Sequence, residues 1–401
     1  MLILAIIVRF SRLGLTVLAA TCLLPLAVDP VAAKPGRAAM ATVPARHMQF
    51  EAGTLLDYKR MRLPAFYRAK AWRILYVTRD YRLRPVFSTG MVVLPDRAPK
   101  IPMERAFVAW AHPTTGIARK CAPSLRQSPI KAIEGLNELV ASGVVVTASD
   151  YPGLGTEGPI GYLVGKGQAY AVIDSVRAAR QIPGVGGSSN YALWGFSQGG
   201  HAALFAADEA STYAPELSLR AAAVVAPPTD LARLLKADLH SVEGRVLAAM
   251  TLASWSRKYD VSLRPLVDDS VMDVIDDVNS NCVDDLGSKL DVLAAQKPLS
   301  RRFLNFDPTS RRPWSDLLME NSKFVLRSKV PLFVAQGTTD ALVRPEVTLQ
   351  FIRNSCRQGV PIRYAPVKAK GHGASAAAAA PGAVAWLTSY LRGRPLPGNC
   401  R

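Results

Sequence analysis

The chain has 401 residues, of which 49% are hydrophobic and 20% are charged. This composition excludes a largely disordered chain, and the length allows one large domain with insertions. The formal net charge of +18 comes from dispersed residues without an arginine-rich block. Nucleic-acid binding is therefore not expected, although loose contact with lipid or anionic surfaces is compatible with this charge.

The N-terminal stretch 1–33 has the features of a secretory signal peptide. Arg9 and Arg12 precede an apolar run over residues 13–28, and small residues at 31–33 offer a cleavage site. The run is short for a membrane span, and prolines follow it. We expect cleavage near Ala33 and export to the periplasm or the outside of the cell. A retained membrane anchor is the alternative, and a lipid anchor on Cys22 is a minor one.

The stretch 34–228 is interpreted as the first part of an α/β domain. Residues 34–70 look irregular, whereas residues 73–95 alternate between apolar and polar and predict an antiparallel pair at a sheet edge. Short buried strands then alternate with helical patterns; the strands are expected at 106–112, 144–150, 191–195 and 220–228, and the helices at 130–143, 167–182 and 198–210. Such alternation indicates a mostly parallel sheet with helices on both faces.

The character of the sequence changes over residues 229–327. This stretch is richer in charge, and its helical patterns have no buried strand between them, so we interpret it as a helical insertion. The sheet pattern resumes in residues 328–401, the second part of the α/β domain. There we expect strands at 330–337 and 361–367 and helices at 344–359 and 381–393, with the alanine run at 375–380 joining the last helix.

The pentapeptide Gly195-Phe196-Ser197-Gln198-Gly199 stands between an expected strand and an expected helix. A serine nucleophile on such a sharp turn needs small residues two positions before and after it, because larger ones would clash with neighbouring backbone. The pattern arises by chance in roughly one chain in ten, and a helix-capping serine is the ordinary alternative. Its place after a buried strand favours Ser197 as a nucleophile.

A nucleophilic serine needs a base, and the base needs an acid that orients it, in the chain order serine, acid, histidine. Only His372, in a glycine-flanked loop past the strand at 361–367, follows the insertion. Asp340 follows the strand at 330–337, where a turn aspartate is the alternative. Asp307 and Asp316 come before that strand and are too early. The expected triad is therefore Ser197, Asp340 and His372.

Two backbone N–H groups must stabilise the oxyanion that forms during acyl transfer. The residue after the nucleophile, Gln198, is expected to supply one. The loop after the strand at 106–112 should supply the other, from Thr114 or, as runner-up, Thr115. His112 is expected to brace this loop, and His201, one helical turn after the nucleophile, to have a structural role.

Cleavage of the signal peptide would leave four cysteines, Cys121, Cys282, Cys356 and Cys400. An even number in an exported chain suggests two disulfides, and three pairings are possible. We favour Cys121 with Cys282, and Cys356 with Cys400, because the second pair would hold the C-terminal tail. Their spacing does not resemble a zinc site, and no phosphate-binding glycine motif is found.

The chain resembles the secreted lipases of the α/β-hydrolase fold, the family of fungal secretory lipases and their bacterial relatives. The residues that carry the resemblance are AWAHPTTGIARKCAPS (109–124), SDYPGLGT (149–156), GFSQGGHAA (195–203), VVAPPTDL (224–231), QGTTDALVRP (336–345) and KGHG (370–373). The resemblance implies the same triad, an insertion that caps the pocket, and hydrolysis of triacylglycerols or simpler esters without a cofactor. Pro113 departs from the glycine common in bacterial relatives and has no N–H.

We therefore expect a secreted serine hydrolase that cleaves carboxylic esters, in the first place a lipase. The main alternative is a short-chain or non-lipid carboxylesterase. A serine peptidase of this fold and an inactive binding protein are weaker alternatives, since the complete triad is in the expected order. A small-molecule or lipid ester is the expected partner, with no cofactor, no metal and no oligomer. Trp255 and nearby leucines of the insertion are candidates for lining an acyl pocket, with packing inside the insertion as an equally good alternative for any single one of them.

Overall fold

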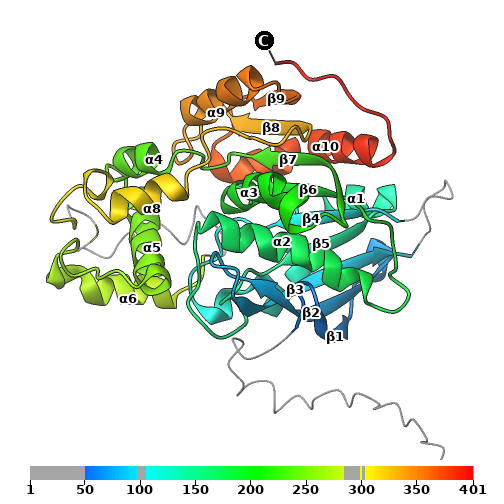
Figure 1. Ribbon diagram of the computed structural model, residues 1–401, viewed down its shortest axis with the longest axis horizontal. Helices are drawn as coiled ribbons and strands as arrows, with labels where there is room; N and C mark the ends of the chain where they lie inside the picture. The colour runs from blue at the N-terminus through cyan, green and yellow to red at the C-terminus, as the bar shows by residue number, and fades with distance from the viewer. Residues whose placement is uncertain (1–49, 97–104, 284–298, 300–302, 401) are drawn as a thin grey trace, which may run out of the picture. The chain divides into compact units, whose positions relative to one another are not determined.

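A nine-stranded sheet forms the centre of the part of the chain that the computed structural model describes, which is residues 50–96, 105–283, 299 and 303–400 (Figure 1). Its strands lie in the order β1-β2-β3-β5-β4-β6-β7-β8-β9. The expected signal peptide and Cys22 lie outside the described residues.

Antiparallel strands form one edge of the sheet. The expected pair consists of β2 (Ala69–Arg79) and β3 (Pro85–Pro95), which run antiparallel with Arg73 opposite Met91. The expectation that residues 34–70 are irregular is wrong for β1 (Leu55–Met61), which pairs with β2. Four consecutive residues of β1 are exposed. This strand therefore lacks the alternation of apolar and polar residues by which a half-buried strand is recognised in a sequence. Its backbone pairing with β2 is what makes it a strand.

The rest of the sheet is parallel, as expected. Strand β3 pairs antiparallel with β5, and all later pairs are parallel. The parallel strands are β4 (Phe107–Ala111), β5 (Val145–Ser149), β6 (Asn190–Phe196), β7 (Ser218–Val225), β8 (Leu332–Gly337) and β9 (Ile362–Val367). Every residue of β4, β5 and β8 is buried. Burial on both faces explains why these strands read as continuous apolar runs.

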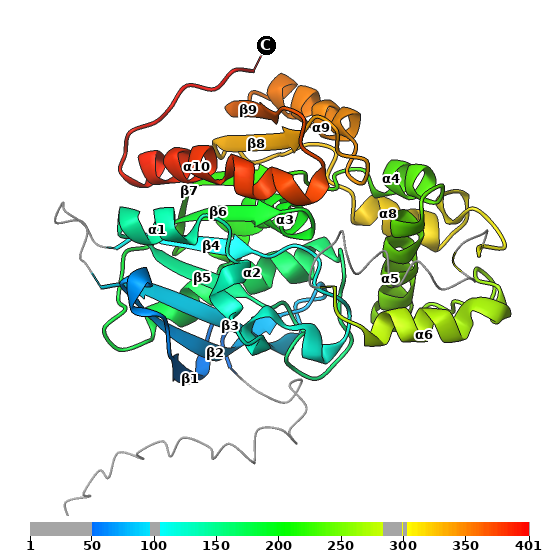
Figure 2. The same ribbon diagram turned by 180° about the vertical axis from the view of Figure 1, so that it is seen from behind.

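Helices cover both faces of the sheet (Figures 1 and 2). The helices α2 (Gly165–Arg180) and α3 (Gln198–Tyr213) belong to one core, together with Phe351 and Ile352 of α9 (Pro345–Arg357). The helices α1 (Leu136–Ser142) and α10 (His372–Leu391) belong to the core on the opposite face. Alternate side chains of β4 enter the two cores, as the period of two in a strand requires.

The expectation of one continuous helix over 130–143 is wrong. A short 3₁₀ turn covers Pro129–Ala132, and α1 begins only at Leu136. Gly135, which precedes α1, has φ +69°, a left-handed conformation that interrupts an α-helix and suits glycine. The interruption also brings Gly135 against α10, where an added Cβ would lie 3.1 Å from a methyl carbon of Val384.

Between β7 and β8 the described residues are helical and contribute no strand to the sheet. The helices are α4 (Leu231–Asp238), α5 (Val242–Tyr259), α6 (Met272–Ser280) and α8 (Trp314–Glu320), and they gather at one side of the sheet in Figure 1. They share a hydrophobic core of their own. We refer to residues 229–327 as the helical insertion.

Two side chains of α5 attach the helical insertion to the loop between β5 and α2. The Ser254 hydroxyl donates to the carbonyl of Ile160 at 2.7 Å, and the indole N–H of Trp255 donates to the carbonyl of Tyr162 at 2.8 Å. No helix in the described residues is long and apolar enough to span a membrane.

Candidate active site

Ser197 occupies a strained turn between β6 and α3. Its backbone has φ +54° and ψ −119°, a conformation that a residue with a side chain rarely adopts. Such strain costs about 1–3 kcal/mol and is found mostly where function requires it. Strand β6 ends at Phe196, directly before Ser197, and helix α3 begins at Gln198, directly after it.

The two glycines of the pentapeptide permit this turn. A Cβ at Gly195 would lie 2.2 Å from the carbonyl oxygen of Gly199, and a Cβ at Gly199 would lie 1.8 Å from that of Ala111. Both neighbours are backbone atoms, so a side chain could not be accommodated by a rotamer change. The spacing of the glycines is therefore a steric requirement, and it also places the end of β4 against the start of α3.

The structure brings Ser197, His372 and Asp340 together. Nε2 of His372 lies 2.9 Å from the Ser197 hydroxyl oxygen, and Nδ1 of His372 lies 2.8 Å from Oδ2 of Asp340. All three residues are at least 90% buried. In this arrangement Nδ1–H donates to the carboxylate, which leaves Nε2 free to accept the serine proton. Residues that are 175 and 32 positions apart in sequence thus form one hydrogen-bonded chain.

The loop after β8 holds the carboxylate of Asp340. Its Oδ1 accepts the backbone N–H groups of Leu342 at 3.0 Å and Val343 at 2.9 Å. The amide of Gln336 donates to Oδ2 at 3.1 Å. Three donors from the protein therefore fix the plane of the carboxylate that orients His372.

His372 lies at the start of a helix, whereas a glycine-flanked loop was expected. It is the first residue of α10, and the helix continues through the alanine run and Pro381 to Leu391. Alanine has the highest helix propensity, and the alanines at 376–380 extend the expected helix toward its N-terminus. The side chain still follows the last strand directly, so the expected position of the base relative to β9 is unchanged.

A small apolar cavity adjoins the Ser197 and His372 side chains. It measures about 80 Å³, and Gln198 and Tyr162 contribute to its wall. Most of the remaining wall is formed by residues of the helical insertion, and leucine is the commonest type among them: Leu231, Leu234, Leu235, Leu247, Leu252 and Leu318. Trp255, a candidate for this wall, instead lies fully buried in the core of the insertion. Its indole N–H donates to the backbone carbonyl of Tyr162, a residue that does line the cavity.

His112 binds its own loop, after β4. Its Nδ1 lies 2.6 Å from the carbonyl oxygen of Pro113, and its Nε2 lies 3.2 Å from that of Asp150. Burial lowers the pKa of His112 to about 4, so the ring is neutral near pH 7 and its single N–H donates to one of these oxygens. Tyr151 supports the same loop, because its hydroxyl donates to the carbonyl of His112 at 3.0 Å.

The two threonines proposed for the oxyanion site follow His112 and are buried. The Thr114 hydroxyl lies 3.0 Å from that of Tyr162, and the Thr115 carbonyl accepts the N–H of Val283. A Cβ added at Gly199 would lie 2.8 Å from the carbonyl oxygen of His112, so the start of this loop lies close to the start of α3. The first N–H groups of a helix have no partner within the helix. The assignment of Gln198 and of Thr114 or Thr115 as donors stays a proposal.

His201 connects α3 to the helical insertion. Its Nε2–H donates to the carbonyl of Asn321 at 2.7 Å, and burial lowers the pKa of His201 to about 4. The Asn321 side chain in turn accepts the N–H of Gly165 at 3.0 Å. Sequence reasoning missed Asn321, because an asparagine after a charged helix has no distinguishing pattern.

Two disulfides join Cys121 to Cys282 and Cys356 to Cys400. This is the pairing favoured from the sequence. The first disulfide links the segment after β4 to the helical insertion, next to a backbone bridge between Gly116 and Cys282. Among the described residues, no group of three or more histidine, cysteine or acidic side chains could hold a metal ion.

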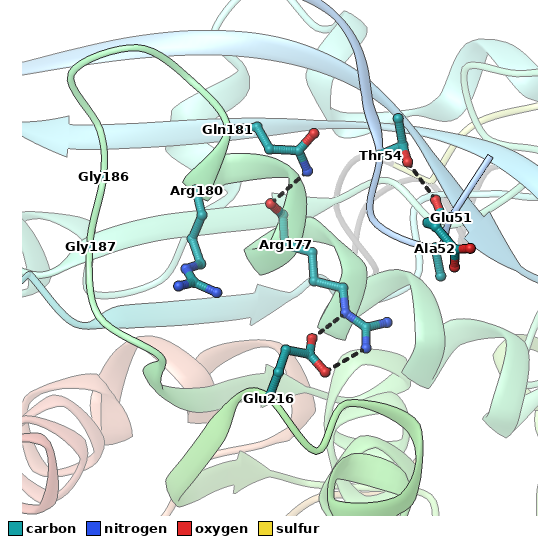
Figure 3. A pocket seen from close by; sticks show the side chains of 9 residues that line it. All are labelled: Glu51, Ala52, Thr54, Arg177, Arg180, Gln181, Gly186, Gly187 and Glu216. Atoms are coloured by element: carbon teal, nitrogen blue, oxygen red, sulfur yellow. Dashed lines mark hydrogen bonds and ion pairs between the residues drawn. The ribbon is translucent and has the colours of Figure 1, made fainter.

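Figure 3 shows a larger hollow of about 470 Å³, lined mainly by polar and charged side chains. Arg177 is its central side chain, and it is already paired with Glu216 at 2.7 Å and with Asp174 at 2.8 Å. The side chain of Gln181 donates to the backbone of Arg177 in the same view. The hollow holds none of the three triad residues, so its size does not make it the candidate active site.

Comparisons with known proteins place the chain among lipases and esterases. A sequence model of the family described as "Secretory lipase" matches residues 133–399. Lipase 6 of Candida albicans (strain SC5314 / ATCC MYA-2876) is 25% identical over 281 residues. The match covers 65% of this chain and 58% of that lipase. The chain thus spans less than two thirds of the length of the first curated relatives it matches.

Two solved structures have the same fold. Lipase A of Candida antarctica has a TM-score of 0.73 at 18% identity, with 88% of this chain and 84% of that chain covered. The rice cell wall degrading esterase LipA of Xanthomonas oryzae has a TM-score of 0.71 at 20% identity, with 86% and 100% covered. They confirm the expected α/β-hydrolase fold, with helices around a mostly parallel sheet.

Proposed function

This chain belongs to the secretory lipase family, and we propose that it is a secreted serine hydrolase that cleaves carboxylic esters through an acyl-enzyme. The observation that carries the proposal is the hydrogen-bonded chain from Ser197 through His372 to Asp340 on a strained strand-to-helix turn. The assembled triad also weighs against an inactive binding protein of this fold.

The first half of the reaction transfers the acyl group to the enzyme. The Ser197 oxygen attacks the ester carbonyl carbon while Nε2 of His372 takes the serine proton. Asp340 keeps His372 in the correct tautomer and stabilises the imidazolium. The N–H groups of Gln198 and Thr114 stabilise the oxyanion of the tetrahedral intermediate. His372 then gives its proton to the departing alcohol as the carbon–oxygen bond breaks.

The second half releases the acid. Water attacks the acyl-enzyme and gives a proton to His372, and the oxyanion forms again. The Ser197 oxygen then leaves and recovers its proton from His372. Water is the only co-reactant that these steps need.

Lipid esters are the first candidate substrates. The cavity beside Ser197 has a wall of leucines that suits an aliphatic acyl chain, and the curated relatives include lipases. A short-chain or non-lipid carboxylesterase is the second candidate. Its support is the volume of about 80 Å³, which is far below the roughly 300–1,000 Å³ typical of sites for drug-sized ligands. The family name and the two disulfides support export, since disulfides persist in oxidising compartments.

A chain-length series tests the proposal. The mature protein is incubated with p-nitrophenyl esters from acetate to palmitate, beside Ser197→Ala and a matched Ser211→Ala variant of an exposed serine on α3. We expect hydrolysis that the first substitution abolishes and the second preserves. Hydrolysis that survives Ser197→Ala, or no ester hydrolysis at all, would overturn the proposal. A maximum at acetate or butyrate would favour the esterase over the lipase.

A further inference from the structure

One carboxyl group interrupts the leucine wall of the cavity beside Ser197. Asp238, the last residue of α4, lines the same cavity as the Ser197 and His372 side chains. The residue is 9% exposed. The mechanism proposed above does not use it, and a carboxyl is the most costly kind of group to leave in an apolar cavity.

The carboxyl of Asp238 lacks a hydrogen-bond partner in the part of the chain that the structure describes. Its buried Oδ1 accepts no hydrogen bond there. Arg344 is the neighbouring cation, and its Nη2 lies 3.9 Å from Oδ1 of Asp238. This separation is beyond hydrogen-bond distance. That Nη2 donates instead to the carbonyl of Ala237 at 3.1 Å. Within the described residues, Nε of Arg344 also has no partner.

Backbone packing fixes Asp238 in this position. The N–H of Ser241 donates to the carbonyl of Asp238 at 2.9 Å, and the Ser241 hydroxyl caps α5 by accepting the N–H of Gly244 at 3.0 Å. Gly244 packs so closely that an added Cβ would lie 2.4 Å from the Cβ of Asp238. The turn between α4 and α5 therefore holds this residue at the cavity, so its buried carboxyl is a built feature of the wall.

We propose that Asp238 is a specificity-determining residue that hydrogen-bonds a hydroxyl group on the acyl part of the ester bound at Ser197. This inference rests on the proposed function of Ser197. The expected substrates are hydroxyacyl esters, whose chain fits the leucine wall and whose hydroxyl satisfies the carboxyl. A site built to bind a substrate hydroxyl discriminates strongly against the analogue that lacks it, because its polar group is then left unpaired.

The charges around Asp238 favour a hydroxyl over an ammonium group. Burial raises the pKa of Asp238 to about 7, the charge of Asp340 acts in the same direction, and the charge of Arg344 opposes it. Near neutral pH the carboxyl is therefore partly protonated and can both donate to and accept from a hydroxyl. Tyr162, on the same cavity, has a pKa raised to about 12 by burial and stays neutral. Arg344 would repel an ammonium group.

Paired substrates test the inference. We would measure kcat/KM for p-nitrophenyl butanoate against its 3-hydroxy derivative, and for the hexanoate against its 6-hydroxy derivative. The variants are Asp238→Leu, the isosteric Asp238→Asn, and Asp276→Leu, a control that removes an exposed carboxyl of the helical insertion. We expect wild type and the control to prefer at least one hydroxy ester about tenfold. That ratio corresponds to about 1.4 kcal/mol, within the range for a buried polar group left unpaired.

Asp238→Leu should reverse this preference, and Asp238→Asn should keep part of it, since an amide also binds a hydroxyl. A wild-type ratio of one or less for both pairs would overturn the inference, as would an unchanged ratio in Asp238→Leu. In either case, continued loss of hydrolysis in Ser197→Ala would leave the proposed function intact. If Asp238→Leu fails to fold, the ratio in Asp238→Asn decides: an unchanged value overturns the inference.

Discussion

Replacing Asp238 by asparagine should change how the stability of the protein depends on pH. The pKa of Asp238 is about 7 in the folded protein, against an ordinary value of 3.8. Between these values the folded state keeps a proton that the unfolded chain has lost. The stabilisation from this group is therefore complete below about pH 4 and is lost as the pH rises through 7. Asparagine has no such proton to lose.

The expected size of the effect follows from the difference between the folded and unfolded pKa values. A tenfold change in proton affinity corresponds to about 1.4 kcal/mol, so Asp238 should remove roughly 3 kcal/mol from the free energy of unfolding between about pH 4.5 and pH 8.5. Urea unfolding at both pH values, with the disulfides intact, measures this change in the free energy of unfolding. Asp276→Asn is the control for an exposed carboxyl. Wild type and the control should lose roughly 3 kcal/mol more than Asp238→Asn. Equal pH dependence in all three proteins would refute the reasoning that this carboxyl is buried and poorly compensated.

Two further substitutions test the geometry of the site. Gly199→Ala would place a Cβ 1.8 Å from a backbone oxygen at the end of β4. We therefore expect it to lower the free energy of unfolding, measured in urea, by more than about 3 kcal/mol. Gly373→Ala is the control and should be tolerated, because the added carbon would have open space around it. Equal stability of the two variants would contradict the steric argument. Asp340→Asn should lower kcat on p-nitrophenyl butyrate by about 10³–10⁴-fold with a correct fold, because the amide favours the wrong tautomer of His372. A kcat within tenfold of wild type would exclude Asp340 as the orienting acid.

The parallel sheet and the meeting of Ser197, Asp340 and His372 were predictable because their signals are local or depend only on chain order. Apolar runs mark strands that are buried on both faces. The glycines around Ser197 mark a turn that excludes side chains. The order of Asp340 and His372 after the insertion follows from the order in which parallel strands end at one edge of a sheet.

The features that sequence reasoning missed depend on contacts between distant segments. Strand β1 carries consecutive exposed residues and is recognisable only through its pairing with β2. The break before α1 depends on the left-handed backbone of Gly135 against α10. Asp238 reads as an ordinary polar residue near a helix end, and only the packing of α4 and α5 beside Ser197 shows it to be a buried carboxyl in the cavity wall.

Covalent labelling tests the central claim most directly. An alkyl fluorophosphonate phosphonylates an activated serine: a bond from the serine oxygen to phosphorus replaces the phosphorus–fluorine bond, and fluoride and the serine proton are released. Mass spectrometry of the digested protein locates the added group. The account predicts one equivalent bound at Ser197, with loss of ester hydrolysis in proportion, and no labelling of Ser197→Ala or of denatured protein. Labelling at another residue, or full labelling that leaves ester hydrolysis intact, would contradict the account.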